Sequence, residues 1–166
     1  MQQSRTTVVG WDVGELIDFI DSGIEHCRAG RWEKGADYLG YVAERSHSDL
    51  SGASLYLSYL GCATARIQGP TKEARALCEH AVKVEFYQPE NWANLAEVML
   101  LSEKRKEAVA AVRQGLEIDP QNERLQELEA NLGLRRPPVL GVLSRANPLN
   151  RILGRLRNDL LGASGR

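Results

Sequence analysis

The stretch that most constrains the fold of this chain is residues 92–122, which carries two apolar stripes at helical spacing. Apolar residues three or four positions apart lie on one face of a helix. A polar break at residues 102–105 separates the stripes, and Pro120 keeps the residue before it out of the helical region. The stretch therefore predicts two short helices, a turn and a stop. The first stripe comprises Trp92, Leu95, Ala96, Met99 and Leu100, and the second comprises Ala108, Val109, Val112, Leu116 and Ile118.

A more degenerate helix pair is predicted over residues 12–44. Asp12 and Glu15 have the spacing of a capping box, so a helix is expected to begin at Asp12 and to run to residue 28. A turn at residues 30–32 separates it from a second helix at residues 33–44. The first helix has apolar positions at Leu16, Ile17, Phe19, Ile20 and Ile24, and the second is expected to bury Ala36, Leu39, Val42 and Ala43.

A further pair and a single final helix are predicted on either side of the 92–122 stretch. Gly69 and Pro70 turn the chain between the two helices of the pair, and Pro70 suits the first position of a helix. The residues of the first helix, 52–68, that are expected to face inward are Leu57, Leu60, Gly61, Thr64 and Ile67. The second helix is expected to bury Ala74, Leu77, Cys78, Ala81 and Val84. The final helix, residues 122–132, turns inward Leu125, Leu128 and Leu132 and exposes Glu123, Glu127 and Glu129. Gly133 predicts its end.

The order of residue types in residues 92–120 is an aromatic residue, Leu-Ala, Ala and then Gly-Leu-Glu-Ile-Asp-Pro. This order closely resembles the tetratricopeptide repeat, a helix-turn-helix unit of about 34 residues. Leu60 and Gly61 match the Leu-Gly pair of the motif, and Gly115 stands where the motif prefers alanine. The resemblance implies an all-α fold, a right-handed superhelix of about three helix pairs with a capping helix and a C-terminal amphipathic helix.

The charge of the chain divides it into an acidic body and a basic tail. Residues 135–166 hold seven arginines and one aspartate, a net charge of +6, whereas residues 1–134 hold 14 basic and 21 acidic groups, a net charge of −7. We expect a loose arm at residues 1–11, a solenoid at residues 12–133 and a basic extension at residues 134–166. The extension is similar to the tails of bacterial tetratricopeptide proteins of unassigned function.

Within the extension, residues 147–161 are predicted to form an amphipathic helix, with Asn147 as its N-cap and Pro148 at its first position. One face carries Leu149, Ile152, Leu153, Leu156 and Leu160, and the opposite face carries Arg151 and Arg155. Such a helix can lie on an anionic membrane or dock in a groove of this protein or of a partner. We expect residues 137–160 to pack on the C-terminal repeats of the chain itself.

The resemblance also implies a concave groove, which in this family holds a peptide or a partner helix. The first helix of each pair lines it, and the expected lining comprises Ile20, Ile24, Cys27, Arg28, Leu55, Tyr59, Cys62, Arg66, Ala93 and Glu97. Arg28 and Arg66 are expected to be exposed there. The alternative for Ile20 and Ile24 is packing against the N-terminal arm or the tail. Both also stand where the carboxylate clamp of chaperone-binding members needs Lys and Asn, which disfavours a clamp.

Catalytic and metal-binding patterns are not found in the sequence. It contains no G-x-S-x-G, no H-E-x-x-H and no phosphate loop. Cys27, Cys62 and Cys78 form no C-x-x-C pair, so buried reduced thiols are expected rather than a metal site. No cofactor is implied. The arginines of the tail lack interleaved aromatic residues, so nucleic acid is not an expected partner.

A non-catalytic adaptor or chaperone-like module that binds another protein is therefore the expected function. The alternatives are a membrane-surface assembly factor that acts through the tail helix and a small chaperone of secretion substrates. No stretch approaches the roughly 18 apolar residues of a membrane span, and the first residues lack the apolar core of a signal peptide. We expect a cytoplasmic location.

Overall fold

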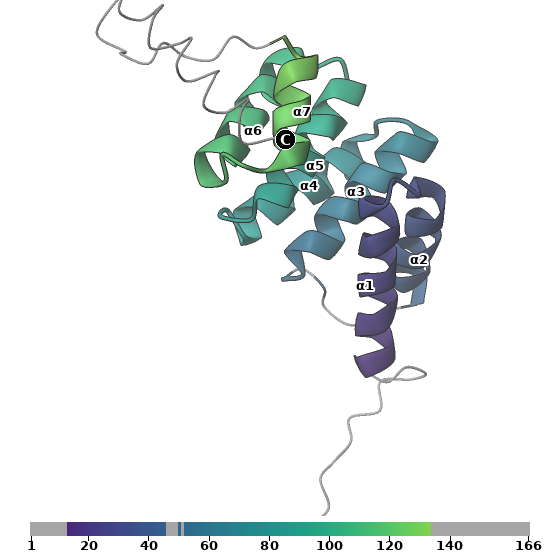
Figure 1. Ribbon diagram of the computed structural model, residues 1–166. Coiled ribbons are helices and arrows are strands. Elements are labelled where there is room, and N and C mark those ends of the chain that lie inside the picture. Colours follow the sequence, from purple (N-terminus) through teal and green to yellow (C-terminus); the bar gives the residue numbers. More distant parts are fainter. Residues whose placement is uncertain (1–12, 46–49, 51, 134–166) are drawn as a thin grey trace, which may run out of the picture. The chain divides into compact units, whose positions relative to one another are not determined.

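The computed structural model describes residues 13–45, 50 and 52–133, and these residues form seven helices and no strand (Figure 1). The helices are α1 (Val13–Arg28), α2 (Trp32–Arg45), α3 (Ser54–Gln68), α4 (Lys72–Val84), α5 (Pro89–Leu101), α6 (Arg105–Ile118) and α7 (Glu123–Asn131). They belong to one compact unit that ends at Leu132. None of these helices is long and apolar enough to cross a membrane. The N-terminal arm and the C-terminal amphipathic helix lie outside the described residues.

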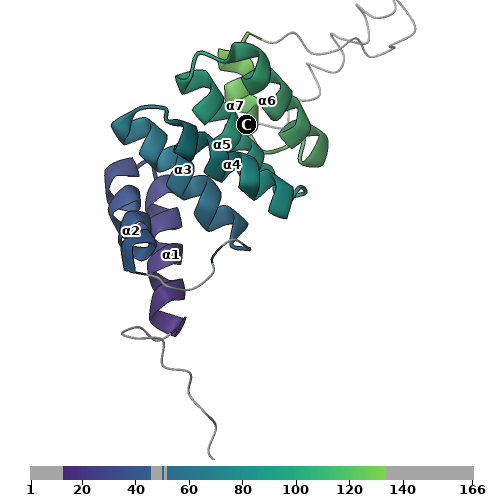
Figure 2. The same ribbon diagram turned by 180° about the vertical axis from the view of Figure 1, so that it is seen from behind.

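The helices are arranged as three stacked pairs with a single helix at the end (Figures 1 and 2). Each short turn joins two helices that pack on each other, namely α1 with α2, α3 with α4, and α5 with α6. The first helices of the pairs also contact one another, because α3 packs against both α1 and α5. Helix α7 packs on α5 and α6 and covers the last pair. The prediction of an all-α superhelix of about three helix pairs with a capping helix is thus confirmed.

Local capping interactions determine where two of the helices begin. The hydroxyl of Thr71 accepts a hydrogen bond from the backbone N–H of Ala74 at 3.1 Å, so Thr71 is the N-cap of α4. Pro70 therefore precedes the cap and does not begin the helix, which corrects the expectation from the sequence. Asn122 caps α7 in the same way, through a 3.1 Å bond from the N–H of Leu125. Helix α2 begins at Trp32, one residue earlier than expected.

Glycine permits two close helix contacts. A Cβ atom on Gly61 would lie 2.5 Å from the carbonyl oxygen of Ala74, so the backbones of α3 and α4 approach each other closely at this point. A Cβ atom on Gly115 would lie 2.6 Å from Leu125 Cδ1 and 3.1 Å from Trp92 Cβ. Gly115 therefore leaves room for the leucine with which α7 packs on α6, where the repeat motif would place alanine.

Four residues that were expected to be buried are exposed: Ile17, Ala43, Ile67 and Val84. Ile67 and Val84 stand in the last turns of α3 and α4, where fewer neighbouring side chains cover a helix. Ile17 and Ala43 stand on α1 and α2, which form the first described pair and have a neighbouring pair on one side only. Elsewhere the apolar spacing holds, and Leu39, Leu57, Cys78, Leu95 and Leu125 are all buried.

We predict that Gly61→Ala lowers the free energy of unfolding by about 1–3 kcal/mol, the usual cost of overpacking. The added methyl group would meet a backbone carbonyl, which cannot move as a flexible side chain does. The matched control is Gly40→Ala in α2, where the new Cβ would meet nothing within 4 Å. This control should be more stable than the parent by about 0.5–1 kcal/mol, because alanine favours the helix. Denaturant unfolding followed by circular dichroism measures both, and equal stability of the Gly61 variant and the parent would contradict the close contact.

Candidate functional site

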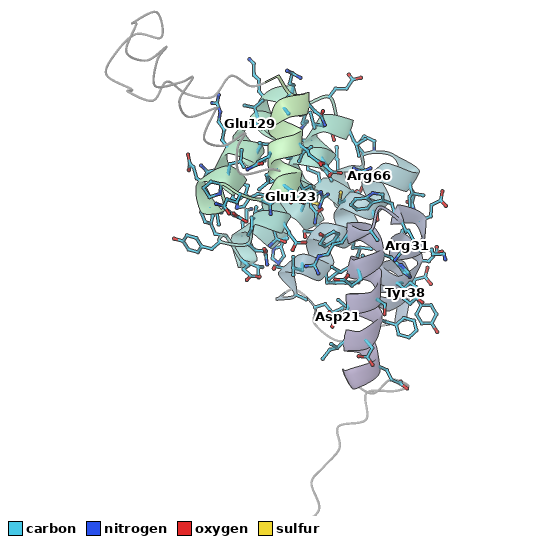
Figure 3. The ribbon with its side chains drawn as sticks, viewed as in Figure 1. Asp21, Arg31, Tyr38, Arg66, Glu123 and Glu129 are labelled. Carbon is cyan, nitrogen blue, oxygen red and sulfur yellow. The ribbon has the colours of Figure 1, made fainter. Side chains whose placement is uncertain are left out.

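A pocket of about 570 Å³ lies on the side of the molecule formed by α1, α3, α5 and α7, the first helix of each pair together with the capping helix. Figure 3 shows two of its lining residues, Arg66 of α3 and Glu123 of α7, on the same face of the molecule. The pocket is lined by Cys27, Arg28, Gly30, Trp32, Tyr59, Arg66, Glu90, Glu97, Asn122, Glu123, Arg124 and Glu127. It is therefore rich in charged and aromatic side chains.

Glu97 of α5 holds two arginines from two other helices. Its Oε2 atom accepts a bond from Arg66 Nε at 2.7 Å and a second from Arg66 Nη2. Its Oε1 atom accepts bonds from Nε and Nη2 of Arg124 at 2.8 and 2.6 Å. The side chain of Glu97 is only 9% exposed, whereas those of Arg66 and Arg124 are 37% and 26% exposed. One buried carboxylate thus pairs with two partly exposed guanidinium groups, which leaves a local net charge of +1.

Glu90, also on α5, forms a second polar centre about two turns away. Arg28 of α1 donates to both of its oxygens, from Nε at 3.0 Å and from Nη2 at 2.8 Å, and the hydroxyl of Tyr59 donates to Oε2. Burial acts to raise the pKa of Glu90, but the bonds from Arg28 and Tyr59 and the charge of Arg28 outweigh it, so the pKa lies below its usual value. Glu90 is therefore held as a carboxylate that joins α1, α3 and α5.

The ring of Trp32 lies beneath the arginines of the first centre. The Cζ atom of Arg66 is 4.3 Å from the centroid of this ring, and the Cζ atom of Arg124 is 5.4 Å from it. The ring of Tyr59 is stacked beside Trp32, with centroids 6.4 Å apart and an angle of 28° between the planes. Cations within about 6 Å of an aromatic centroid are attracted by its electron-rich face. The pocket therefore combines an aromatic surface with a positive centre.

Residues 65–132 match the family model described as tetratricopeptide repeat. This part of the chain therefore belongs to the tetratricopeptide repeat family. No curated protein matches the chain. The match to the family model accounts for the two-helix period of residues 65–132.

Several solved structures resemble the fold at low sequence identity. The second tetratricopeptide repeat domain of human RPAP3, in complex with an HSP70 peptide, is 17% identical with a TM-score of 0.53, and the match covers 72% of this chain and 96% of that chain. The Arabidopsis OM64 domain is 18% identical with a TM-score of 0.55, with 72% and 94% covered. The Yersinia enterocolitica type III secretion chaperone SycD, in complex with a peptide of the translocator YopD, is 14% identical with a TM-score of 0.52, with 74% and 89% covered. At these identities the likeness concerns the fold alone.

Half of the groove residues expected from the tetratricopeptide register line the pocket, namely Cys27, Arg28, Tyr59, Arg66 and Glu97. Ile24, Cys62 and Ala93 are buried in the core instead. Ile20 and Leu55 are half-buried and pack against the core cluster that contains Ile24. The arginines are partly exposed as expected, but both are paired, so reversal of their charge would set like charges against Glu90 and Glu97.

Most of the lining residues that sequence reasoning missed stand in turns or at the starts of helices. Trp32 was placed in a turn but begins α2, and Arg124 lies on the capping helix, whose charged residues were interpreted as a solvated face. Glu90 is seven residues before Glu97 on α5, so the two share a helix face, and this spacing could have identified it. The remaining missed residues are Gly30, Asn122, Glu123 and Glu127.

The three thiols are buried and free of disulfides. Burial raises the pKa of Cys27 to about 11 and that of Cys62 to about 12, and it raises the pKa of Cys78 well above its usual value. A thiol is nucleophilic as the thiolate, so these three are poor nucleophiles in the folded chain. Among the described residues, no group of three or more His, Cys, Asp and Glu side chains could hold a metal ion.

We predict that Glu90→Gln alters the acid dependence of stability. Because the folded pKa of Glu90 is lowered, its stabilising effect is complete above the unfolded value of ~4.3 and is lost as the pH falls through the folded pKa. At neutral pH the variant should be less stable by ~1–2 kcal/mol, as for hydrogen bonds to a charged group. Below pH ~4.3 the difference should shrink. Urea unfolding at several pH values measures the difference in stability between this variant and the parent, with Glu127→Gln at an exposed position as the control. A stability difference that stays constant with pH would contradict the lowered pKa of Glu90.

A second prediction concerns the thiols. In the native protein, Cys27, Cys62 and Cys78 should react slowly with an aromatic disulfide reagent, because burial limits both access and ionisation. All three should react rapidly once the chain is unfolded in guanidinium chloride. The absorbance of the released thiolate measures both rates, and rapid reaction of the native chain would show that this part of the core opens readily.

Proposed function

We propose that the protein is a non-catalytic interaction module that holds a peptide or a helix of another protein in the concave groove. The observation that carries this proposal is the pocket itself, in which Arg66 and Arg124 lie over Trp32 and share one carboxylate. The solved structures described above include a tetratricopeptide domain and a secretion chaperone, each in complex with a peptide of another protein, which supports a protein partner.

The positive centre favours a carboxylate of the partner. Glu97 takes the Nε and Nη2 edge of both guanidinium groups, and a guanidinium has five N–H donors. A second carboxylate can therefore bind the other edge of Arg66 or Arg124 while Glu97 keeps its bonds. The half-buried ring of Trp32 offers apolar contact area to a neighbouring side chain of the same partner.

This mode of binding differs from a Lys/Asn clamp. Ile24 is buried, and Asn94 is also buried, with its Nδ2 atom donating to Ser58 Oγ at 3.0 Å. Neither residue can present a donor to a ligand in the groove. The proposed recognition therefore depends on the two arginines and on the ring of Trp32 next to them.

The proposal is tested with peptides selected from a random phage-displayed library on the full chain. We predict that Arg66→Gln lowers the affinity for the selected peptides by about tenfold or more, which is the effect of losing a hydrogen bond to a charged group. Neutral glutamine avoids like-charge repulsion at Glu97. Fluorescence anisotropy of labelled synthetic peptides measures the dissociation constants.

The matched control is Arg113→Gln, which removes an exposed arginine on α6, outside the pocket lining. Its affinity for the same peptides should stay within about twofold of the parent, as for a distant independent site. An equal loss of affinity in both variants would point to a nonspecific charge effect. Unchanged affinity of the Arg66→Gln variant would place the binding site elsewhere.

A further inference from the structure

The pocket of the concave groove contains two regions of opposite charge, and the following inference rests on the function proposed above. Its interior holds Glu97 with Arg66 and Arg124, a net charge of +1. Its edge on α7 holds Glu123 and Glu127, both exposed, a net charge of −2. Arg28 and Glu90 form a neutral pair between α1 and α5. The lining as a whole therefore carries three positive and four negative charges in separate places.

The two carboxylates of α7 lie next to the positive centre. Glu123 and Glu127 are four residues apart, so they stand on one face of the helix, one turn from each other. Arg124, which binds Glu97, follows Glu123 directly in the chain. Figure 3 shows Glu123 of α7 and Arg66 of α3 on the same face of the molecule. A ligand seated on the arginines is thus close to the acidic face of α7.

Helix chemistry explains only one of these two glutamates. Glu123 stands in the first turn of α7, where a negative charge is favoured by the partial positive charge of the helix N-terminus. Glu127 stands one turn further along, where that effect has largely faded. It is exposed, and it lines the pocket. Its position is consistent with a role toward a ligand.

We propose that the groove recognises a peptide segment with one acidic and one basic residue close together. The acidic side chain binds the outer edges of Arg66 and Arg124, and the basic side chain lies between Glu123 and Glu127. A segment with only acidic residues is repelled by the face of α7, and a segment with only basic residues is repelled by the positive centre. Like charges brought together at an interface cost binding energy and suppress wrong partners.

The test compares peptides selected from the random library on the full-length parent chain and on the double variant Glu123→Gln, Glu127→Gln. Peptides selected on the parent should be enriched in both acidic and basic residues. Peptides selected on the double variant should keep the acidic residue and should show basic residues only at the frequency of the library. The best parent peptide should bind the variant roughly fivefold more weakly, the size of an exposed ion pair.

The matched control is the double variant Glu33→Gln, Asp37→Asn. These carboxylates are also exposed and four residues apart, but they line a different groove between α2 and α3. Peptides selected on this control should be enriched in the same residue types as those selected on the parent, and the best parent peptide should bind both proteins with equal affinity. Unchanged basic enrichment on the α7 variant would overturn this inference while leaving the proposed function intact. If no peptide is selected, or if Arg66→Gln binds every selected peptide as well as the parent does, the proposed function fails and this inference fails with it.

Discussion

The arrangement of the pocket depends on the buried carboxylate of Glu97. A carboxylate removed from water is costly unless charged donors replace its hydration. Arg66 and Arg124 supply four bonds to its two oxygens, and they come from helices on either side of α5. The three helices must therefore keep the positions that satisfy this group. Trp32 is held in turn, because its ring lies under both arginines.

In this fold, polar contacts between side chains do more than apolar packing to set how neighbouring helices are oriented. Small apolar residues such as Ala63 and Ala96 allow close approach of helices but specify their rotation only loosely. The bond between Asn94 and Ser58 joins the neighbouring helices α3 and α5, and the pair formed by Arg28 and Glu90 joins α1 to α5 across α3. A buried ion pair is weak evidence of added stability, since desolvation offsets much of the attraction. We interpret these contacts as determinants of the shape of the groove.

The fold could be predicted from the sequence because apolar spacing and turn residues are local signals. The pairs of helices, the inward leucines of α7 and the inward position of Gly61 all follow from such spacing. The pocket could be predicted only in part, since its charges pair across residues far apart in the chain. Arg124 and Glu97 are 27 residues apart, and Arg28 and Glu90 are 62 apart. The apolar pattern of one helix does not reveal which distant charged residue its own charged residues will contact. Trp32 stands at the start of a helix, where the apolar spacing gives no signal.

The contact between Trp32 and Arg124 affects how the chain unfolds. In most repeat proteins each unit touches only its neighbours, so the ends can fray while the middle stays folded. Here α2 of the first pair meets the capping helix, and Arg28 of α1 binds Glu90 of α5. Both contacts pass over the second pair. Loss of either terminal unit therefore removes contacts from the other, which couples the unfolding of the two ends.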